Sequence, residues 1–327
     1  MARSGLHELF PELEETLPRV RLGAVPTPIR PLDGLANGPA AVWLKDESLF
    51  GDGGWGGNKV RKLEWLIPEA KRRGRSTILT VGGIGTNWGL ACALYGREHG
   101  LRTVLALIDQ PVDEHVRDQL ERLEASGAEI HFTRTKARTV ATVPWLMLRH
   151  RAYYLPAGGS SPLGALGAVE IGLELAAQVE RGEMPEPSHV VTGVGSGGTA
   201  AGLLLAFRLA GLDTKVVAVV VNDTLRLEAG SLVKLAGRSE RLLRARGAKI
   251  SRGAGVSPDS LMVVNDQMGA GYGHATLEGI RARELAAEAE ELELEPVYTA
   301  KAMAALLGLN DGRLGQGPVV FVNTNGP

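Results

Sequence analysis

The sequence predicts an α/β protein with two lobes and a cleft between them, each lobe built on a parallel sheet flanked by helices. Apolar runs rich in β-branched residues alternate with helix-length segments, as in parallel sheets that are buried on both faces. The chain has 327 residues, 44% of them hydrophobic, which suffices for about two lobes. Residues 155–167 are dense in Gly, Ser and Pro, so we expect a connection that divides the runs into two groups.

Five apolar runs carry the strand prediction. Two precede the connection, at 77–83 and 102–109, and three follow it, at 189–193, 215–221 and 318–323. Helical patterns predict helices over 87–99, 112–126, 165–181 and 198–210. Strand and helix therefore alternate within each group, which favours parallel pairing.

The composition favours chemistry on a small molecule. Lys and Arg number 36 against 37 Asp and Glu, and the charges are scattered along the chain, which argues against a nucleic-acid or membrane partner. No stretch of about twenty apolar residues occurs, and the N-terminal MARSGLHELFPELEE is acidic rather than signal-like. Cys92 is the sole cysteine and is expected to pack as a small hydrophobe. These features predict a cytoplasmic protein.

The stretch GGWGGNKVRKLEW at 53–65 places glycine pairs and a lysine ahead of apolar residues with helical spacing. We expect Asn58 to cap this helix and Lys59 to lie in its first turn. The partial positive charge of a helix N-terminus should lower the pKa of a lysine there, as a Schiff-base lysine requires. The alternative is an ordinary solvated lysine after a flexible loop.

A second glycine-rich loop joins a strand to a helix in HVVTGVGSGGTAAGLLLAF. Backbone N–H groups from Gly195 to Thr199 would face an anion at the helix N-terminus, and Ser196 and Thr199 would add hydroxyl donors. The loop is therefore a candidate phosphate cradle.

Two other interpretations of this loop remain open. Gly193, Gly195 and Gly198 also have dinucleotide-binding spacing, with Asp223 after the next strand as a ribose acceptor. The loop would otherwise be a tight turn that binds no ligand.

A third loop, TVGGIGTNWGLACA, again follows a strand and precedes a helix. Thr86 and Asn87 stand at the helix start, where they could cap the helix or bind a ligand. Three such loops and a lysine suit a ring with a phosphate, an aldehyde for the lysine and an amino-acid carboxylate to be placed. Pyridoxal phosphate meets these requirements, so we predict it as the cofactor. No metal ligands are predicted.

Six ordered motifs resemble the D-cysteine desulfhydrase and 1-aminocyclopropane-1-carboxylate deaminase family of fold-type II pyridoxal-phosphate enzymes: GGNKVRKLEWLIPEA, GGIGTN, GGSSPLGALG, TGVGSGGTAAGL, GAGYG and EPVYTAKAMAALL. The resemblance implies a large cofactor-binding domain from residues 1–60 and 166–327 and a small domain from residues 61–165. It also implies a homodimer, and a lyase that acts on a small amino acid.

The resemblance assigns roles to individual residues. By the family pattern Lys59 carries the cofactor, and we expect its released amine to be the base at the substrate Cα. Asn87 would bond the 3-hydroxyl of the ring, and Lys62 would help to hold the phosphate. Tyr272 and Tyr298 would face the substrate, and with Lys59 and Thr86 they form the predicted catalytic set. The phosphate loop consists of Gly195, Ser196, Gly197, Gly198 and Thr199.

Two threonines favour the desulfhydrase branch. The deaminases carry a glutamate after the tyrosine of PVY, where this chain has Thr299, and Thr324 in NTNG retains the threonine of a desulfhydrase turn without its histidine and one glycine. A neutral hydroxyl near the ring nitrogen makes a weaker electron sink than a carboxylate, which suits a good leaving group. We therefore expect elimination from D-cysteine or a β-substituted alanine. The alternative is 1-aminocyclopropane-1-carboxylate or a different amino acid.

The predicted substrate-binding loop departs from the family pattern. The family usually has glutamine, serine, asparagine and then histidine or glutamine, whereas this chain has Gly85, Thr86, Asn87 and Trp88. Thr86 retains a hydroxyl. Trp88 either packs between the lobes or reshapes the pocket for another amino acid.

Two other function classes stay open at this point. One is a nicotinamide-binding oxidoreductase that uses the loop at 193–198. The other is a catalytically inactive binding protein, which the altered loop at 86–88 suggests. A visible spectrum distinguishes a nicotinamide enzyme from an enzyme with a lysine-bound cofactor. Turnover of D-cysteine distinguishes an active enzyme from an inactive binding protein.

Overall fold

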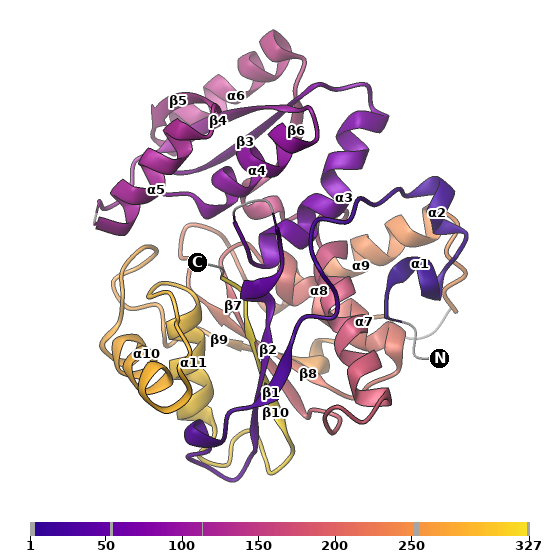
Figure 1. Cartoon of the computed structure of the whole chain (residues 1–327), viewed down its shortest axis with the longest axis vertical. Helices are drawn as coiled ribbons and strands as arrows, with labels where there is room; N and C mark the ends of the chain where they lie inside the picture. The colour runs from indigo at the N-terminus through magenta and orange to yellow at the C-terminus, as the bar shows by residue number, and fades with distance from the viewer. Residues whose placement is uncertain (1–3, 53–54, 113, 252–254, 326–327) are drawn as a thin grey trace.

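The computed structural model describes residues 4–52, 55–112, 114–251 and 255–325. Two sheets organise this part of the chain, and Figure 1 shows the smaller one in an upper lobe and the larger one in a lower lobe. Gly53 and Gly54 of the glycine-rich stretch, and Gly326 of NTNG, lie outside the described residues.

The larger sheet has six strands in the order β1-β2-β10-β7-β8-β9. Only β1 with β2 pairs antiparallel among these described strands, and the other pairs are parallel. Two N-terminal strands thus join a sheet whose other strands come from the C-terminal half. The strands are β1 (Ile29–Pro31), β2 (Val42–Asp46), β7 (His189–Val194), β8 (Lys215–Val220), β9 (Leu261–Val264) and β10 (Val319–Asn323).

The smaller sheet has four parallel strands in the order β5-β4-β3-β6. They are β3 (Thr77–Gly83), β4 (Arg102–Ile108), β5 (Glu129–Arg134) and β6 (Tyr153–Leu155). All of them fall within the range predicted for the small domain. The exact boundaries at residues 60 and 165 stay a prediction, because α3 (Asn58–Arg72) crosses the first of them.

Helices cover both sheets. The upper lobe has α4 (Asn87–Glu98), α5 (Glu114–Ala125) and α6 (Lys136–His150), and the lower lobe has α7 (Leu166–Glu180), α8 (Gly198–Ala210), α9 (Ala229–Ala245), α10 (Leu277–Glu290) and α11 (Thr299–Leu309). Two short helices, α1 (Leu6–Leu9) and α2 (Leu13–Thr16), precede them. Within the described residues, no helix combines the length and hydropathy needed to cross a bilayer.

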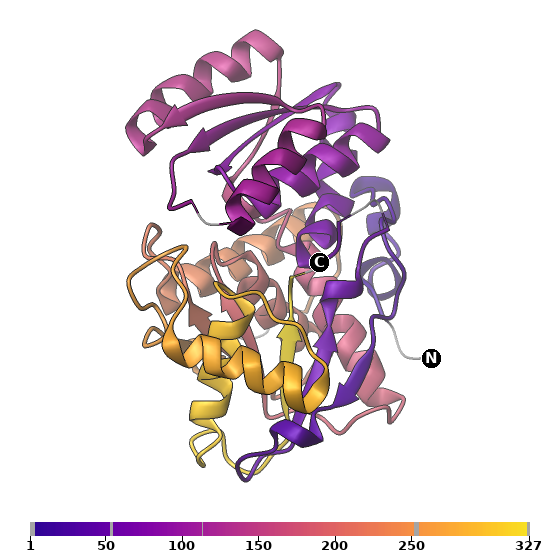
Figure 2. The same ribbon diagram turned by 60° about the vertical axis from the view of Figure 1, so that its left-hand side comes forward.

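Strand alternation explains why the larger sheet is buried on both faces. Val190 and Val216 belong to a core with residues of α7 and α8, and Val191 and Val217 belong to a second core with residues of α10 and α11. Successive strand residues point to opposite faces, so an uninterrupted apolar run supplies both cores. Figure 2 shows α10 in front of the sheet from a second direction. The predicted α/β fold is confirmed.

Candidate functional site

A cavity of about 720 Å³ lies where the carboxyl ends of β3, β4 and β7 meet. This is the usual position of a ligand site in a parallel α/β sheet. Two predicted site residues, Gly198 and Thr299, are not among those lining it. The other predicted residues all line it, namely Lys59, Lys62, Gly85, Thr86, Asn87, Trp88, Gly195, Ser196, Gly197, Thr199, Tyr272, Tyr298 and Thr324.

The start of α3 places Lys59 in the cavity. Gly57 is the N-cap, with φ of 108°, a value that glycine adopts without a steric penalty. The prediction that Asn58 caps the helix is wrong, since Asn58 is the first helical residue. Its side-chain Nδ2 instead donates to Thr199 Oγ1 at 2.8 Å, which ties α3 to the phosphate loop.

Lys59 lies beside an aromatic ring and near a partly buried carboxyl group. Its Nζ is 5.6 Å from the centre of the Tyr298 ring. Burial lowers the pKa of Lys59, and the nearby Glu295 opposes this shift. The lowered pKa increases the neutral fraction of the amine, which is the form that attacks a carbonyl or removes a proton.

Lys62 lies one turn further along the same side of α3. It is 4% exposed, and its Nζ donates to the Gly158 carbonyl at 2.8 Å. Burial, and then the charge of Lys59, lower the pKa of Lys62 to about 7. An anion in the cavity would favour its charged form.

The loop before α8 forms a cradle at the helix N-terminus. Gly197 is the N-cap with φ of 87°, and the Gly198 N–H donates to Ser160 Oγ at 2.9 Å. Ser160 Oγ is also 2.8 Å from Ser196 Oγ. A Cβ on Gly198 would come within 2.6 Å of Ser160 Oγ, so only glycine permits this approach. Hydroxyls and N–H groups at a helix N-terminus fit a phosphate.

Sequence reasoning missed Ser160, although it stands in the quoted motif GGSSPLGALG. We expected the segment 155–167 to be a connection, and most of it does join β6 to α7. Its first half also borders the cavity through Ala157 and Gly158. The two adjacent serines were the signal that could have identified it.

The loop between β3 and α4 contains a helix cap, Thr86, and the side-chain amide of Asn87. Thr86 is the N-cap of α4, and its Oγ1 accepts from the Gly89 N–H at 3.1 Å. Asn87 Nδ2 donates to Asn325 Oδ1 at 3.1 Å. Asn87 Oδ1 is buried and has no hydrogen-bond partner within the described ranges. A buried amide oxygen in this state requires a donor, such as a ligand hydroxyl.

Trp88 is 3% exposed and its Nε1 donates to Thr80 Oγ1 at 2.8 Å. It packs in the core and also borders the cavity. A Cβ on Gly159 would come within 2.7 Å of the Trp88 ring. Trp88 therefore supports the turn that precedes Ser160, in addition to bordering the cavity.

Two tyrosines meet on the cavity wall. Their hydroxyl oxygens are 2.6 Å apart and their rings pack edge to face. Burial raises the pKa of both Tyr272 and Tyr298, so both stay protonated. Asp223, the ribose acceptor of the dinucleotide interpretation, accepts from the Tyr272 N–H at 3.1 Å and so holds the tyrosine loop.

Thr299 and Thr324 differ in whether their side chains border the cavity. Thr299 is 1% exposed, and its Oγ1 accepts from the Glu295 N–H at 2.8 Å and donates to the Glu295 carbonyl at 3.2 Å. Thr324 lines the cavity. Of these two threonines, Thr324 borders the ligand space and Thr299 does not, so the structure does not support the predicted contact of Thr299 with the cofactor.

Glu295 is a cavity residue that sequence reasoning missed. Its carboxylate accepts from the Tyr298 N–H at 2.7 Å and from the Val297 N–H, so it organises the turn before α11. Burial raises the pKa of Glu295, and these N–H groups and Lys59 oppose the shift. The sequence feature that could have identified Glu295 is its position two residues before Val297 in the motif EPVY.

These residues together fit pyridoxal phosphate. The cradle at α8 matches its phosphate, Lys59 its aldehyde, and the unsatisfied Asn87 oxygen its ring hydroxyl. The family described as pyridoxal-phosphate dependent enzymes matches residues 20–325. The chain belongs to this family. The predicted cofactor is confirmed, and the nicotinamide interpretation is set aside.

Relatives of known activity narrow the kind of pyridoxal-phosphate enzyme. D-cysteine desulfhydrases of Salmonella paratyphi A and Salmonella newport are each 31% identical over 322 residues, which cover 94% of this chain and 94% of each relative. This likeness confirms a pyridoxal-phosphate-dependent enzyme of the D-cysteine desulfhydrase and ACC deaminase type.

Solved structures confirm the fold type. A homologue of ACC deaminase has a TM-score of 0.79 at 26% identity, over 96% of this chain and 94% of that one. The processed form of threonine deaminase isoform 2 from Solanum lycopersicum has a TM-score of 0.67 over 98% of this chain and 85% of that one. At 15% identity the second shows the fold alone.

Proposed function

We propose that this enzyme eliminates the β-substituent of a small amino acid, with D-cysteine as the substrate to test first. D-cysteine and water would give pyruvate, sulfide and ammonia. The observation that carries the proposal is the Lys59 amine over the Tyr298 ring, whose hydroxyl pairs with that of Tyr272, in one cavity with the phosphate cradle. The desulfhydrase relatives support the choice of substrate.

The pKa shifts divide the roles in this mechanism. The bound cofactor supplies an electron sink for the electron pair left at Cα. Lys59, with its lowered pKa, takes the Cα proton, whereas Tyr272 and Tyr298, with raised pKa values, stay protonated and donate hydrogen bonds. The N-terminus of α4, with Thr86 and Asn87, offers N–H groups to the substrate carboxylate.

A good leaving group suits this site. Thr299 takes the position at which deaminases of the resembled family carry a glutamate, but it does not line the cavity, whereas the neutral Thr324 does. Neither position therefore supplies a carboxylate that would keep the ring nitrogen positively charged. A thiolate departs readily even when the electron sink is weak. Opening an unactivated cyclopropane is harder, so we expect little or no activity on 1-aminocyclopropane-1-carboxylate.

A side-by-side assay of keto-acid release tests the proposal. Wild-type enzyme should release pyruvate and sulfide from D-cysteine and little 2-oxobutyrate from 1-aminocyclopropane-1-carboxylate. Lys59→Ala should abolish turnover and the borohydride-fixed cofactor, by removing both the attachment and the base. Efficient 2-oxobutyrate production without sulfide from D-cysteine would favour the deaminase alternative, which the solved ACC deaminase homologue supports.

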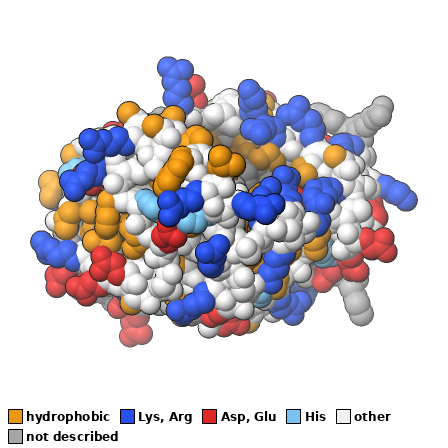
Figure 3. Space-filling model, turned by 90° about the horizontal axis from the view of Figure 1, so that it is seen from above, with side chains coloured by type: hydrophobic (Ala, Val, Ile, Leu, Met, Phe, Trp, Pro, Cys, Tyr) orange, Lys and Arg blue, Asp and Glu red, His pale blue; other side chains and the backbone are white. Residues whose placement is uncertain are grey.

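We also propose a homodimer in the cytoplasm. Three large apolar side chains, Val140, Trp145 and Leu148, are 74%, 50% and 79% exposed on α6. Figure 3 views the molecule from above and shows groups of hydrophobic side chains among basic ones on this face. The family resemblance implies a homodimer, and we propose that the second copy covers Trp145 and Leu148, since Val140 also borders the cavity. The single cysteine and the enzyme class support the location.

A further inference from the structure

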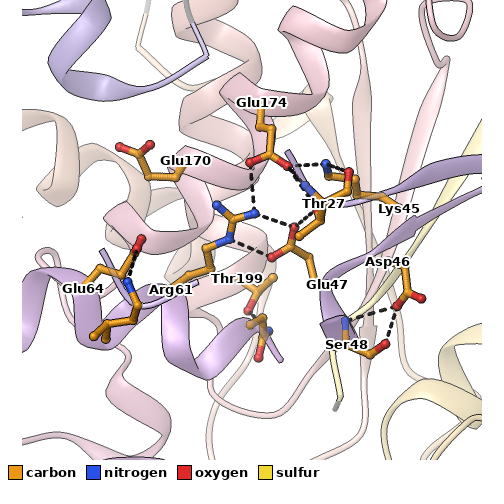
Figure 4. Close-up of polar contacts among 12 residues, drawn as sticks. Thr27, Lys45, Asp46, Glu47, Ser48, Arg61, Glu64, Glu170, Glu174 and Thr199 are labelled. Atoms are coloured by element: carbon orange, nitrogen blue, oxygen red, sulfur yellow. Dashed lines mark hydrogen bonds and ion pairs between the residues drawn. The ribbon is translucent and has the colours of Figure 1, made fainter. Parts of the chain in front are cut away.

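A cluster of buried charged side chains that pair with one another surrounds Arg61 in the first turns of α3. Its members, which we call the Arg61 cluster, are Lys45, Glu47, Arg61 and Glu174, each at most 2% exposed. They come from β2, from the single turn Glu47–Leu49, from α3 and from α7. Thr27 joins two of them, since its hydroxyl lies 2.6 Å from a Glu47 oxygen and 3.0 Å from a Glu174 oxygen. Figure 4 shows these side chains converging from separate elements.

Arg61 is the centre of the cluster. Its Nε and Nη2 each donate to a Glu47 oxygen at 2.9 Å, and Nη2 also donates to Glu174 Oε2 at 3.0 Å. Its guanidinium carbon lies 3.8 Å from the centre of the Phe50 ring. Such a two-bond fork is directional, so it restricts the rotation of the group that carries it.

The helix connects Arg61 rigidly to Lys59. Residues two positions apart on an α-helix point about 200° apart, so Arg61 points into the large lobe when Lys59 points into the cavity. The backbone of Arg61 is held as well. A Cβ on Gly167 would come within 2.5 Å of the Arg61 carbonyl carbon, which shows how closely α7 packs there.

Stability alone is a poor reason for such a cluster. Desolvation offsets much of the attraction within a buried ion pair, and apolar replacements are often as stable. A fixed geometry is a better reason at this place. A displacement of about 1 Å at a catalytic group can cost about 100-fold in rate.

We propose that Arg61 is a positioning residue for Lys59. Its fork to Glu47 and its bond to Glu174 set the rotation and depth of the first turn of α3, and so the position at which the Lys59 amine meets the cofactor and the substrate. This inference rests on the proposed role of Lys59.

Two substitutions in the holoenzyme test the proposal. Arg61→Lys keeps the charge and loses the fork, and Glu47→Gln keeps the shape and loses the charge. In both we expect kcat to fall by about tenfold or more with a smaller change in KM, because a displaced amine affects the reaction more than binding. We also expect faster loss of cofactor and a shifted pH midpoint of the visible absorption band.

Arg72→Lys is the matched control. Arg72 makes the same two-bond fork on the same helix, to Glu69 at 2.8 and 2.9 Å, but it is 43% exposed and lies near the other end. We expect its kcat, cofactor retention and absorption midpoint to match the wild type.

Several results would overturn the proposal. One is a lower melting temperature in Arg61→Lys and Glu47→Gln with kcat, retention and absorption midpoint unchanged, because the cluster would then be only structural. Another is an equal effect in Arg72→Lys. If Arg61→Lys does not fold, Glu47→Gln decides by itself. Cofactor retention and the midpoint of the absorption band are measured without substrate, so they test the role of Arg61 even if D-cysteine is not turned over. Absence of D-cysteine turnover would count against the proposed function alone.

Discussion

Lys59 and Lys62 are three positions apart on α3, and we propose different roles for them. Lys62 has a pKa of about 7, because burial first and Lys59 second disfavour its charge. It is therefore mostly neutral at pH 8. A phosphate dianion would favour the charged form, so binding at pH 8 should be accompanied by proton uptake. The uptake should disappear well below pH 7, where Lys62 is already protonated.

Calorimetry of the apoenzyme with inorganic phosphate measures this uptake, in two buffers of different ionisation enthalpy. Lys62→Met should reduce the uptake and weaken phosphate binding by about 10- to 100-fold, the loss of a hydrogen bond to a charged group. Lys71→Met on the exposed end of α3 is the control and should keep both. Unchanged proton uptake in Lys62→Met would refute the assignment.

The loop before α8 works as a unit rather than as separate donors. A methyl group at Gly198 would come within 2.6 Å of Ser160 Oγ and displace the serine from the Gly198 N–H. We expect Gly198→Ala to weaken cofactor retention by about tenfold, which corresponds to about 1.4 kcal/mol, with a smaller effect on kcat at saturating cofactor.

Equilibrium dialysis against pyridoxal phosphate would measure this loss of retention. Gly237→Ala in α9 is the matched control, because a Cβ there meets no atom within 4 Å. It should retain the cofactor normally and stabilise α9 by about 0.5–1 kcal/mol. Normal retention in a folded Gly198→Ala variant would mean that another segment holds the phosphate.

The proposed homodimer predicts the mass of the whole molecule in solution. Light scattering should give twice the 34.6 kDa of one chain. Leu148→Asp should shift the protein toward a monomer, because it places a charge on the exposed apolar surface of α6. Leu277→Asp on α10 is the control, since Leu277 is 69% exposed but far along the chain in the other lobe. A wild-type monomer, or dissociation by both substitutions, would contradict an interface at α6.

The elements that sequence reasoning predicted are long and regular. The helix predicted over 198–210 coincides with α8, and the strand predicted over 77–83 coincides with β3. Other segments were not predicted, among them the three-residue strands β1 and β6 and also the long helices α6, α9 and α10. A three-residue strand contains too little periodicity to be recognised, and its pairing partner decides its conformation.

The sequence by itself determined the α/β architecture, the lysine and the glycine-rich loops, because periodicity and backbone freedom are local properties. The tertiary structure alone decided which distant groups meet. Asn58 bonds Thr199 rather than capping its own helix, Ser160 completes the cradle at Gly198, and Arg61 meets Glu174 from 113 positions away. Charged and polar side chains have no periodicity that identifies their partners. The packing of α3 against α7 and the bond from Asn58 to α8 bring them into a dry interior, where an unpaired polar group is costly.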